Sequence, residues 1–275
     1  MHFTAHNVLL DSGERTMNDK LVLISESKVW SSANQILDFV FPKESFDRSK
    51  LRAVDIGCLE GGYSVELARS GFDTLGIEAR QTNLDKCNYV KSGLNLANLK
   101  FVKDDAKNIE SYGKFDVTFC YGLLYHLENP AKFLEALSRT TSKLLLLHTH
   151  YAPERDIRYE LGMLNSRYLA PLHKRVQFLS SSRNYRLSKK TIHEGYRGRW
   201  YSEWSPNSTK SKIENLLWAS YSNSKSFWLL KKDLTEILYK VGFDYVFEQH
   251  NFTGDIFDHS TVEYINRSMF VALKK

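Results

Sequence analysis

The feature that most constrains the fold is the stretch from residue 51 to 62, where a short apolar run leads into closely spaced glycines. The run is typical of a buried parallel strand and carries one acid, Asp55. Gly57 and Gly61 then let the backbone turn sharply and approach a ligand before a helix begins at Tyr63. A strand, a glycine turn and a helix in this order predict a nucleotide-binding cradle.

The spacing of these glycines argues against a dinucleotide. Dinucleotide sites use Gly-x-Gly-x-x-Gly, in which the second glycine admits the pyrophosphate. This chain has Asp-x-Gly-x-x-x-Gly, beginning at Asp55. A carboxylate at this place repels a pyrophosphate and suits a ligand that carries an amine, so the pattern favours S-adenosylmethionine over NAD.

Strand and helix patterns alternate from residue 51 to 150. Because crossovers between parallel strands are right-handed, this alternation predicts an open, doubly wound α/β sheet with helices on both faces. Residues 1–50 are expected to cap this core, with a short strand at 21–24 and a helix at 30–41. The predicted core elements are strands 53–56, 74–77, 100–103, 115–121 and 143–149, and helices 63–70, 82–92 and 130–140.

The alternation stops in residues 151–225, which hold basic and aromatic side chains and few apolar runs. Such a length inside a domain predicts a lid or an insertion, and Trp200, Trp204 and Trp218 argue against a solvated linker. Residues 226–275 are expected to complete the core sheet, through a helix at 231–241 and strands at 245–248 and 269–273.

The positive charge of the chain is concentrated in the same insertion. The net charge is +6, and residues 151–225 alone carry 14 Lys and Arg against 6 Asp and Glu. This surplus favours either an anionic partner near the insertion or a solvated charged surface.

Composition gives expectations about location. No apolar run approaches the roughly 20 residues that cross a bilayer, and the N-terminus lacks the pattern of a secretory signal. The three cysteines are an odd number without metal-ligand spacing, which favours a reducing compartment. We therefore expect a cytoplasmic protein without a membrane partner.

Acids follow other predicted strands at the same edge of the sheet. Glu78 lies 21 residues beyond Gly57, where a carboxylate of a nucleotide-binding unit accepts hydrogen bonds from both ribose hydroxyls. Asp105 is placed to accept the adenine amino group, while the N–H of Ala106 meets a ring nitrogen. Each acid alone is equally well explained as solvated, but the combination favours cofactor binding.

Together, Asp55 to Gly61, Glu78, Asp105-Ala106 and the segment 115–127 resemble the class I S-adenosylmethionine-dependent methyltransferases. The resemblance covers residues 51–150 and 231–273. It implies a Rossmann-like sheet of seven strands whose last strand is antiparallel, and an enzyme that uses S-adenosylmethionine.

The resemblance also implies roles for single residues, with Asp55 near the methionine amine and Cys120 offering a backbone carbonyl. The chain departs from many members at Leu59-Glu60, where they have small residues, so Glu60 either crowds the site or faces solvent. The cofactor-binding set is Asp55, Gly57, Cys58, Gly61, Glu78, Ala79, Asp105, Ala106 and Cys120.

Methyl transfer to an oxygen needs aligned reactants and often a base. His126 follows the fourth core strand and His150 ends the fifth, so both are candidate bases. A hydrogen-bonded loop histidine is the alternative for His126. His148 shares a strand face with His150, but no carboxylate or cysteine is spaced with them, and we expect no metal site.

Segment 195–204 alternates aromatic and basic side chains that can stack on sugars or bases and hold anions. Tyr196, Arg199 and Trp200 from this segment, with Tyr125, are the predicted substrate-binding residues. The alternative is a lid hairpin whose tryptophans pack on the sheet edge, although a lid that excludes water also touches substrate.

The favoured function is O-methylation of a small hydroxylated metabolite, such as a sugar or glycan precursor, with an anionic or sugar-like substrate under the lid. A second hypothesis is methyl or carboxymethyl transfer to tRNA, since the Tyr-His after strand four and the Arg-rich insertion are similar to wobble-uridine carboxymethyl transferases. The modest charge surplus and the lack of an RNA-binding module weigh against nucleic acid. A third is a methyltransferase-fold protein that binds without turnover, which the strand-end acids disfavour.

Overall fold

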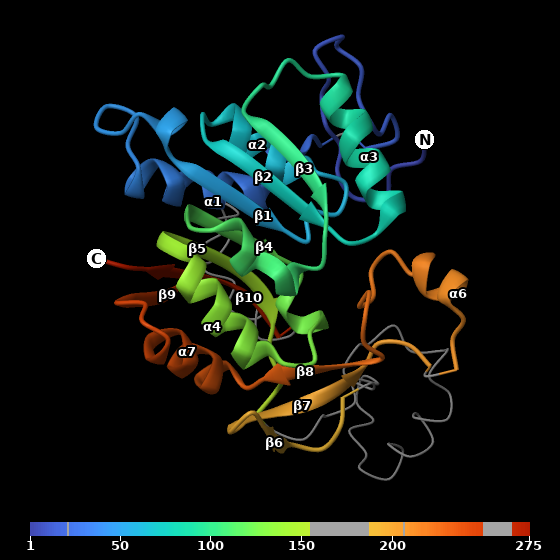
Figure 1. Cartoon of the computed structure of the whole chain (residues 1–275), viewed down its shortest axis with the longest axis vertical. Helices are drawn as coiled ribbons and strands as arrows, with labels where there is room; N and C mark the ends of the chain where they lie inside the picture. The colour runs from blue at the N-terminus through green and yellow to red at the C-terminus, as the bar shows by residue number, and fades with distance from the viewer. Residues whose placement is uncertain (21, 155–186, 206, 250–265) are drawn as a thin grey trace, which may run out of the picture.

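A seven-stranded sheet forms the centre of the computed structural model, which describes residues 1–20, 22–154, 187–205, 207–249 and 266–275 (Figure 1). The strand order is β3-β2-β1-β4-β5-β10-β9, and all neighbours are parallel except that β10 is antiparallel to both β5 and β9. The predicted sheet is confirmed, including its antiparallel last strand. The strands are β1 (Arg52–Ile56), β2 (Asp73–Glu78), β3 (Leu99–Lys103), β4 (Phe115–Tyr121), β5 (Thr141–His150), β9 (Tyr245–Gln249) and β10 (Arg267–Leu273).

Helices cover both faces of this sheet. Successive residues of β1 pack on opposite faces of the sheet. Ala53 packs with side chains of α1 and α2, and Val54 packs with side chains of α4 and α7. Burial on both faces is what the continuous apolar strands require. One face carries α1 (Lys28–Val40), α2 (Gly62–Arg69) and α3 (Gln81–Ser92), and the other carries the 3-10 helix η3 (Ala106–Tyr112), α4 (Pro130–Thr140) and α7 (Lys231–Lys240).

Local chemistry fixes the helix starts. The Ser27 side chain accepts a hydrogen bond from the Trp30 N–H and begins α1. Pro130 occupies the first turn of α4, where its missing N–H costs nothing. The carboxylate of Glu194 accepts from the next two N–H groups of that helix, Ala131 (2.9 Å) and Lys132 (3.1 Å). Glu194 thus connects the start of α4 to the insertion.

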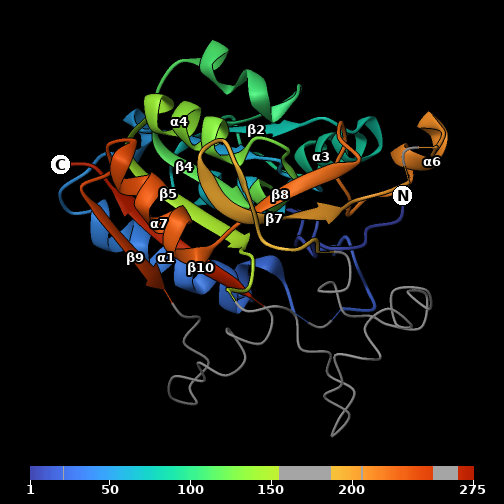
Figure 2. The ribbon, with the colours of Figure 1, turned by 90° about the horizontal axis from the view of Figure 1, so that it is seen from below.

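A second sheet is formed by two strands of the insertion and by residues 225–229, all but the first of which were expected to belong to the core; a lid hairpin was predicted here only as an alternative. Its strands are antiparallel in the order β6-β7-β8. The Phe227 N–H donates to the Leu127 carbonyl (2.9 Å) and the Trp228 indole donates to the Tyr125 carbonyl (2.8 Å), so this sheet is attached to the loop after β4. Figure 2, seen from below, shows β7 and β8 near the viewer. Its elements are β6 (Thr191–His193), β7 (Tyr196–Ser202), α6 (Lys210–Glu214) and β8 (Lys225–Leu229).

Two differences from the sequence predictions concern the cap and the lid. The strand expected at 21–24 is wrong, since a 3-10 turn, η1 (Ile24–Glu26), stands there and residue 21 lies outside the described residues. The apolar side chain of Ile24 is buried against α2, so burial, and not strand pairing, explains the apolar pattern. Residues 155–186 of the predicted lid also lie outside the described residues.

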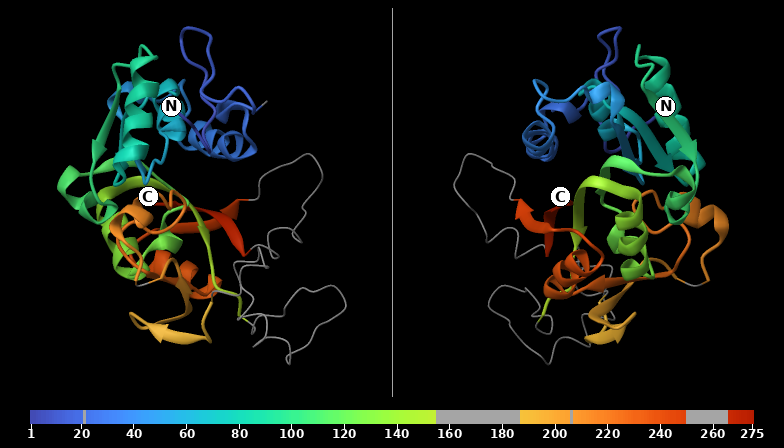
Figure 3. Two further views of the ribbon diagram at one scale, coloured as in Figure 1. Left: turned by 90° about the vertical axis from the view of Figure 1, so that its right-hand side faces the viewer. Right: turned by 60° about the vertical axis from the view of Figure 1, so that its left-hand side comes forward.

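The N-terminal segment lies at one end of the molecule and the small sheet at the other (Figure 3). The remaining 3-10 turns are η2 (Arg48–Lys50) and η4 (Leu124–His126). Within the described residues, no helix is both long and apolar enough to cross a bilayer.

Candidate active site

The glycine turn after β1 brings its backbone close to other elements. Gly57 has a φ of +71°, which side chains rarely adopt, and a Cβ there would lie 3.3 Å from the Leu123 side chain. Its N–H donates to the carbonyl of Ile77 on β2 (2.9 Å). Gly61 is needed for packing, since a Cβ there would lie 2.8 Å from the Phe101 ring. The turn is therefore open to a ligand at its first glycine and filled by core side chains at its second.

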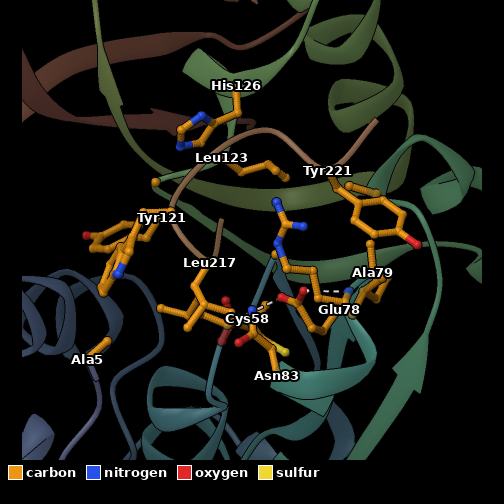
Figure 4. A pocket seen from close by; sticks show the side chains of 18 of the residues that line it. Ala5, Cys58, Glu78, Ala79, Asn83, Tyr121, Leu123, His126, Leu217 and Tyr221 are labelled. Atoms are coloured by element: carbon orange, nitrogen blue, oxygen red, sulfur yellow. Dashed lines mark hydrogen bonds between the residues drawn. The ribbon is translucent and has the colours of Figure 1, made fainter. Parts of the chain in front are cut away.

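A cavity of about 460 Å³ opens at this turn, along the carboxyl ends of the central strands (Figure 4). The strand order reverses between β1 and β4, which is where open α/β sheets bind ligands. The predicted site residues that line the cavity are Asp55, Gly57, Cys58, Glu78, Ala79, Asp105, Ala106, Tyr125 and His126.

Other predicted residues do not line this cavity. Arg199 is buried, and its guanidinium donates to the carbonyls of Pro153 and Ser188, both at 3.0 Å. The Trp200 ring packs edge-on against the Phe227 ring at 5.1 Å, as a lid hairpin packed on the core would. The predicted residues outside the lining are Gly61, Cys120, His150, Tyr196, Arg199 and Trp200.

His150, at the end of β5, does not line the cavity. Its ring stacks on the Trp228 indole at 4.8 Å and meets the Tyr125 ring edge at 4.6 Å. His148 lines the cavity instead, and burial together with the nearby Arg267 lowers the pKa of His148 well below its usual value. His148 is therefore neutral at physiological pH.

Asp55 is a buried acid without a cation beside it. Its side chain accepts a hydrogen bond from the Ser64 hydroxyl (2.6 Å), and the residue is 2% exposed. Burial raises the pKa of Asp55 to about 7, and the charge of Glu78 adds to the rise. Among the described residues no Lys or Arg forms an ion pair with Asp55. The ammonium of a ligand beside Asp55 would therefore stabilise its ionised carboxylate.

Glu78 is held in place by backbone groups at the end of β2. One oxygen accepts from the Leu59 N–H (2.9 Å) and the other from the Arg80 N–H (2.8 Å). Burial raises the pKa of Glu78 in spite of these bonds. Beside it, the buried amide oxygen of Asn83 has no hydrogen-bond partner among the described residues. These oxygens are free to accept from hydroxyl groups such as those of a ribose.

A segment between β7 and β8 covers the part of the cavity near Asp105. Arg80 holds this segment, because its guanidinium donates to the carbonyls of Ile213 (3.1 Å), Ala219 (2.7 Å) and Ser220 (3.1 Å). Figure 4 shows the Tyr221 ring next to Ala79 at the side of the cavity. The half-exposed rings of Trp218 and Tyr221 both line it and offer flat apolar surface.

Glu60 neither crowds the cavity nor faces solvent. It is fully buried and points to the N-terminal segment, where its carboxylate accepts from the N–H groups of Thr4, Ala5 and His6 at 2.8–2.9 Å. Lys86 on α3 forms an ion pair with it at 2.7 Å. Burial opposes ionisation, but these hydrogen bonds lower the pKa of Glu60 to about 2. Glu60 thus fixes the N-terminal segment over the glycine turn.

His126 lies on the opposite side of the cavity from Glu78 (Figure 4). Its Nδ1 is 2.9 Å from the carboxylate of Glu203, which also accepts from the Ser226 hydroxyl (2.7 Å) and the Ser220 N–H (3.1 Å). Burial alone would raise the pKa of Glu203, but the bonds from His126 and Ser226 keep it below its usual value. When the His126 imidazole carries one proton, an ionised Glu203 places that proton on Nδ1 and leaves the Nε2 lone pair available.

Sequence reasoning missed several of these residues. Glu203 lies 77 positions from His126, and Glu60 lies 54 to 56 positions from the N–H groups that it binds. The one available signal was an acid without an assigned role in each motif: Glu60 in the glycine turn and Glu203 in segment 195–204. Among the described residues, no group of three or more His, Cys, Asp and Glu side chains is placed to hold a metal ion.

Comparison with known proteins identifies the class that this fold and cavity define. A model of the methyltransferase domain matches residues 47–194. The N-terminal domain of EvdMO1, solved in the presence of S-adenosylhomocysteine and D-fucose, superposes with a TM-score of 0.62 at 19% identity, over 98% of this chain and 90% of that one. The same domain with S-adenosylhomocysteine bound gives a TM-score of 0.59 at 20% identity, over 91% of this chain and 82% of that one.

The curated relatives are more similar in sequence than these structures but match a smaller share of the chain. A ubiquinone biosynthesis O-methyltransferase of Rickettsia bellii (strain OSU 85-389) is 24% identical over 202 residues, 71% of this chain and 75% of that protein. The Rickettsia conorii protein of the same name is 31% identical over 99 residues, 36% of this chain and only 34% of its own length. The chain belongs to the methyltransferase domain family and is a class I S-adenosylmethionine-dependent methyltransferase.

Proposed function

We propose that the protein transfers a methyl group from S-adenosylmethionine to a hydroxyl oxygen of a small molecule. The observation that carries the proposal is the His126–Glu203 pair, which presents a histidine to the cavity across from the acids at the strand ends. The O-methyltransferase names of the Rickettsia relatives support the same acceptor atom.

The residues present fit the cofactor. Asp55, an acid without a cation, suits the ammonium of the methionyl part, and Glu78 with the unpartnered Asn83 amide oxygen suits the ribose hydroxyls. Asp105 and Ala106 line the cavity beyond Glu78, where the adenine would lie under the Tyr221 segment. The cofactor supplies an electrophilic methyl group on a sulfonium.

His126 would act as the general base. Glu203 accepts the Nδ1 proton, so Nε2 is the atom that takes the proton from the acceptor hydroxyl as the new C–O bond forms. The imidazolium formed in this step is stabilised by the buried carboxylate of Glu203. Because Glu203 also binds the Ser220 N–H, the orientation of His126 is connected to the segment that covers the cofactor.

The test is methyl transfer by the purified full chain. We expect mass spectrometry to detect a methylated product when the protein and S-adenosylmethionine are incubated with a panel of phenols, catechols, hydroxy acids and sugars. The substitutions H126A and E203Q are expected to lower kcat by about 10²- to 10⁴-fold, as loss of a general base does. The affinity for S-adenosylhomocysteine should change little, because neither side chain belongs to the cofactor part of the cavity.

A matched control is H193A, since His193 lies on β6 and outside the cavity lining, where its Nε2 is 3.0 Å from the Asn129 side chain. Its turnover should match the unsubstituted chain. Transfer to bulk tRNA alone, or equal turnover of H126A and H193A, would contradict the proposal.

A further inference from the structure

Arg267, the first residue of β10, lines the cavity beside Tyr125. Its register partner is His150 at the end of β5, and its side chain contributes to the cavity lining. The guanidinium carbon lies 5.6 Å from the centre of the Tyr125 ring. The Tyr125 ring is in turn 4.3 Å from the ring of His126, the proposed base, so Tyr125 contacts both Arg267 and the base.

Among the described residues, Arg267 lacks most of the hydrogen-bond and ion-pair partners that a partly buried charged side chain usually has. One terminal nitrogen approaches Nδ1 of the neutral His148 at 3.4 Å. Within the described ranges of the chain, its buried Nε has no hydrogen-bond partner and no carboxylate forms an ion pair with it. Buried donors without a partner are rare in folded proteins. The unused donors therefore indicate a ligand.

The other two cations that line the cavity are already in use. Arg80 donates to three backbone carbonyls of the segment that covers it. Lys20 donates to the carbonyls of Thr4 (3.2 Å) and Ala5 (3.3 Å), in the segment that Glu60 fixes over the glycine turn. Lys20 is thus held at the N-terminal segment, whereas Arg267 lies beside Tyr125, whose ring contacts that of the proposed base. This arrangement favours the acceptor as the ligand of Arg267.

We infer that Arg267 forms an anion subsite and that the acceptor is a small hydroxylated acid. The guanidinium of an arginine beside an aromatic ring offers parallel N–H groups that match a carboxylate or phosphate. An acid bound there would have its hydroxyl in the space between Tyr125, His126 and the cofactor. This inference rests on the proposed function, because it names the chemical class of the same acceptor.

The test follows the Nε–H signal of Arg267 in ¹⁵N NMR spectra of the full chain, identified by its loss in R267K. With the protein saturated by S-adenosylhomocysteine, millimolar benzoate or inorganic phosphate should move this signal, and neutral benzamide should not. The Nε–H of Arg48 is the internal control, since that residue is 4% exposed and its Nε donates to the Phe41 carbonyl at 2.9 Å. It should not move.

Two results would overturn the inference. The first is a signal that moves with S-adenosylhomocysteine and no further with either anion, which would assign Arg267 to the methionyl carboxylate. The second is a signal that no anion moves. Because the readout is binding, a chain that binds benzoate and transfers no methyl group would contradict the proposed function and leave the subsite standing.

Discussion

Asp55, in strand β1, and Glu60, in the glycine turn that follows it, are both buried and have opposite surroundings. Glu60 has three N–H groups and the Lys86 ammonium around it, and its pKa is lowered to about 2. Asp55 accepts from the Ser64 hydroxyl and forms no ion pair with a cation in the part of the chain that the structure describes, and burial raises its pKa to about 7. A buried charge with its partners built in holds structure together, whereas a buried acid that lacks a cation is typical of a ligand site. The comparison predicts opposite responses to substitution.

The largest expected effect is on Glu60. Replacing it with alanine leaves the Lys86 charge buried and three N–H groups unpaired, so E60A should lower the free energy of unfolding by about 3–5 kcal/mol. Urea denaturation measures this loss. The matched control is E110A, which removes an ion pair between Glu110 and Arg139 whose side chains are about half exposed, and which should cost less than about 1 kcal/mol. Equal losses in the two variants would contradict the anchoring role.

The pH dependence of stability should differ in sign at the two acids. Glu60 has a pKa lower in the folded than in the unfolded chain, so its contribution, roughly 3 kcal/mol, is present above pH 4.5 and is lost as the pH falls toward 2. The difference in unfolding free energy between the unsubstituted chain and E60Q should therefore shrink in acid. A difference that stays constant from pH 7 to pH 2 would show that Glu60 is not held ionised.

Asp55 should show the reverse behaviour. Its pKa is higher in the folded chain, so stability is lost as the pH rises from 3.8 through about 7. We expect D55N to make the cofactor-free protein more stable at pH 8, by about 1–3 kcal/mol, because a buried charge is removed. Thermal unfolding at pH 5 and pH 8 checks this, with the larger gain at the higher pH. A loss of stability at pH 8 would contradict it.

The smallest effect concerns the contact between the N-terminal segment and α2. The Gly62 N–H donates to His6 Nδ1 at 2.9 Å, and a Cβ at Gly62 would lie 2.8 Å from the His6 side chain. G62A should cost about 1 kcal/mol, since the segment can shift to make room. Protease digestion should cut the N-terminal segment faster in G62A than in the unsubstituted chain. Unchanged digestion would mean that this contact does not hold the segment.

Much of the fold could be predicted because its signals are local. Strand β4 and helix α4 match the predicted ranges 115–121 and 130–140, since each has its apolar pattern and its boundary residues within a few positions. The small sheet was foreseen only as the alternative of a lid hairpin, because Arg199, a buried residue within β7, reads as a solvent-exposed charge. Arg199 can be buried because its guanidinium donates to the carbonyl groups of Pro153 and Ser188.

Part of the cavity lining could be predicted for the same reason. Asp55 and Glu78 follow strands whose ends must meet at one edge of a parallel sheet. The partner of His126 could not be found in this way, because the contact with Glu203 joins a loop to the second sheet and no sequence spacing encodes it. Glu60 was equally hidden, since its donors are backbone N–H groups of the N-terminal segment.

The most direct test of the account is the proton balance of cofactor binding. Near pH 6, Asp55 with a pKa of about 7 is mostly protonated in the free protein, and an ammonium bound beside it should displace that proton. Calorimetry of S-adenosylhomocysteine binding in buffers of different ionisation enthalpy should show release of nearly one proton per ligand, and D55N should show none while binding more weakly. Equal proton release and equal affinity in the two proteins would contradict the account.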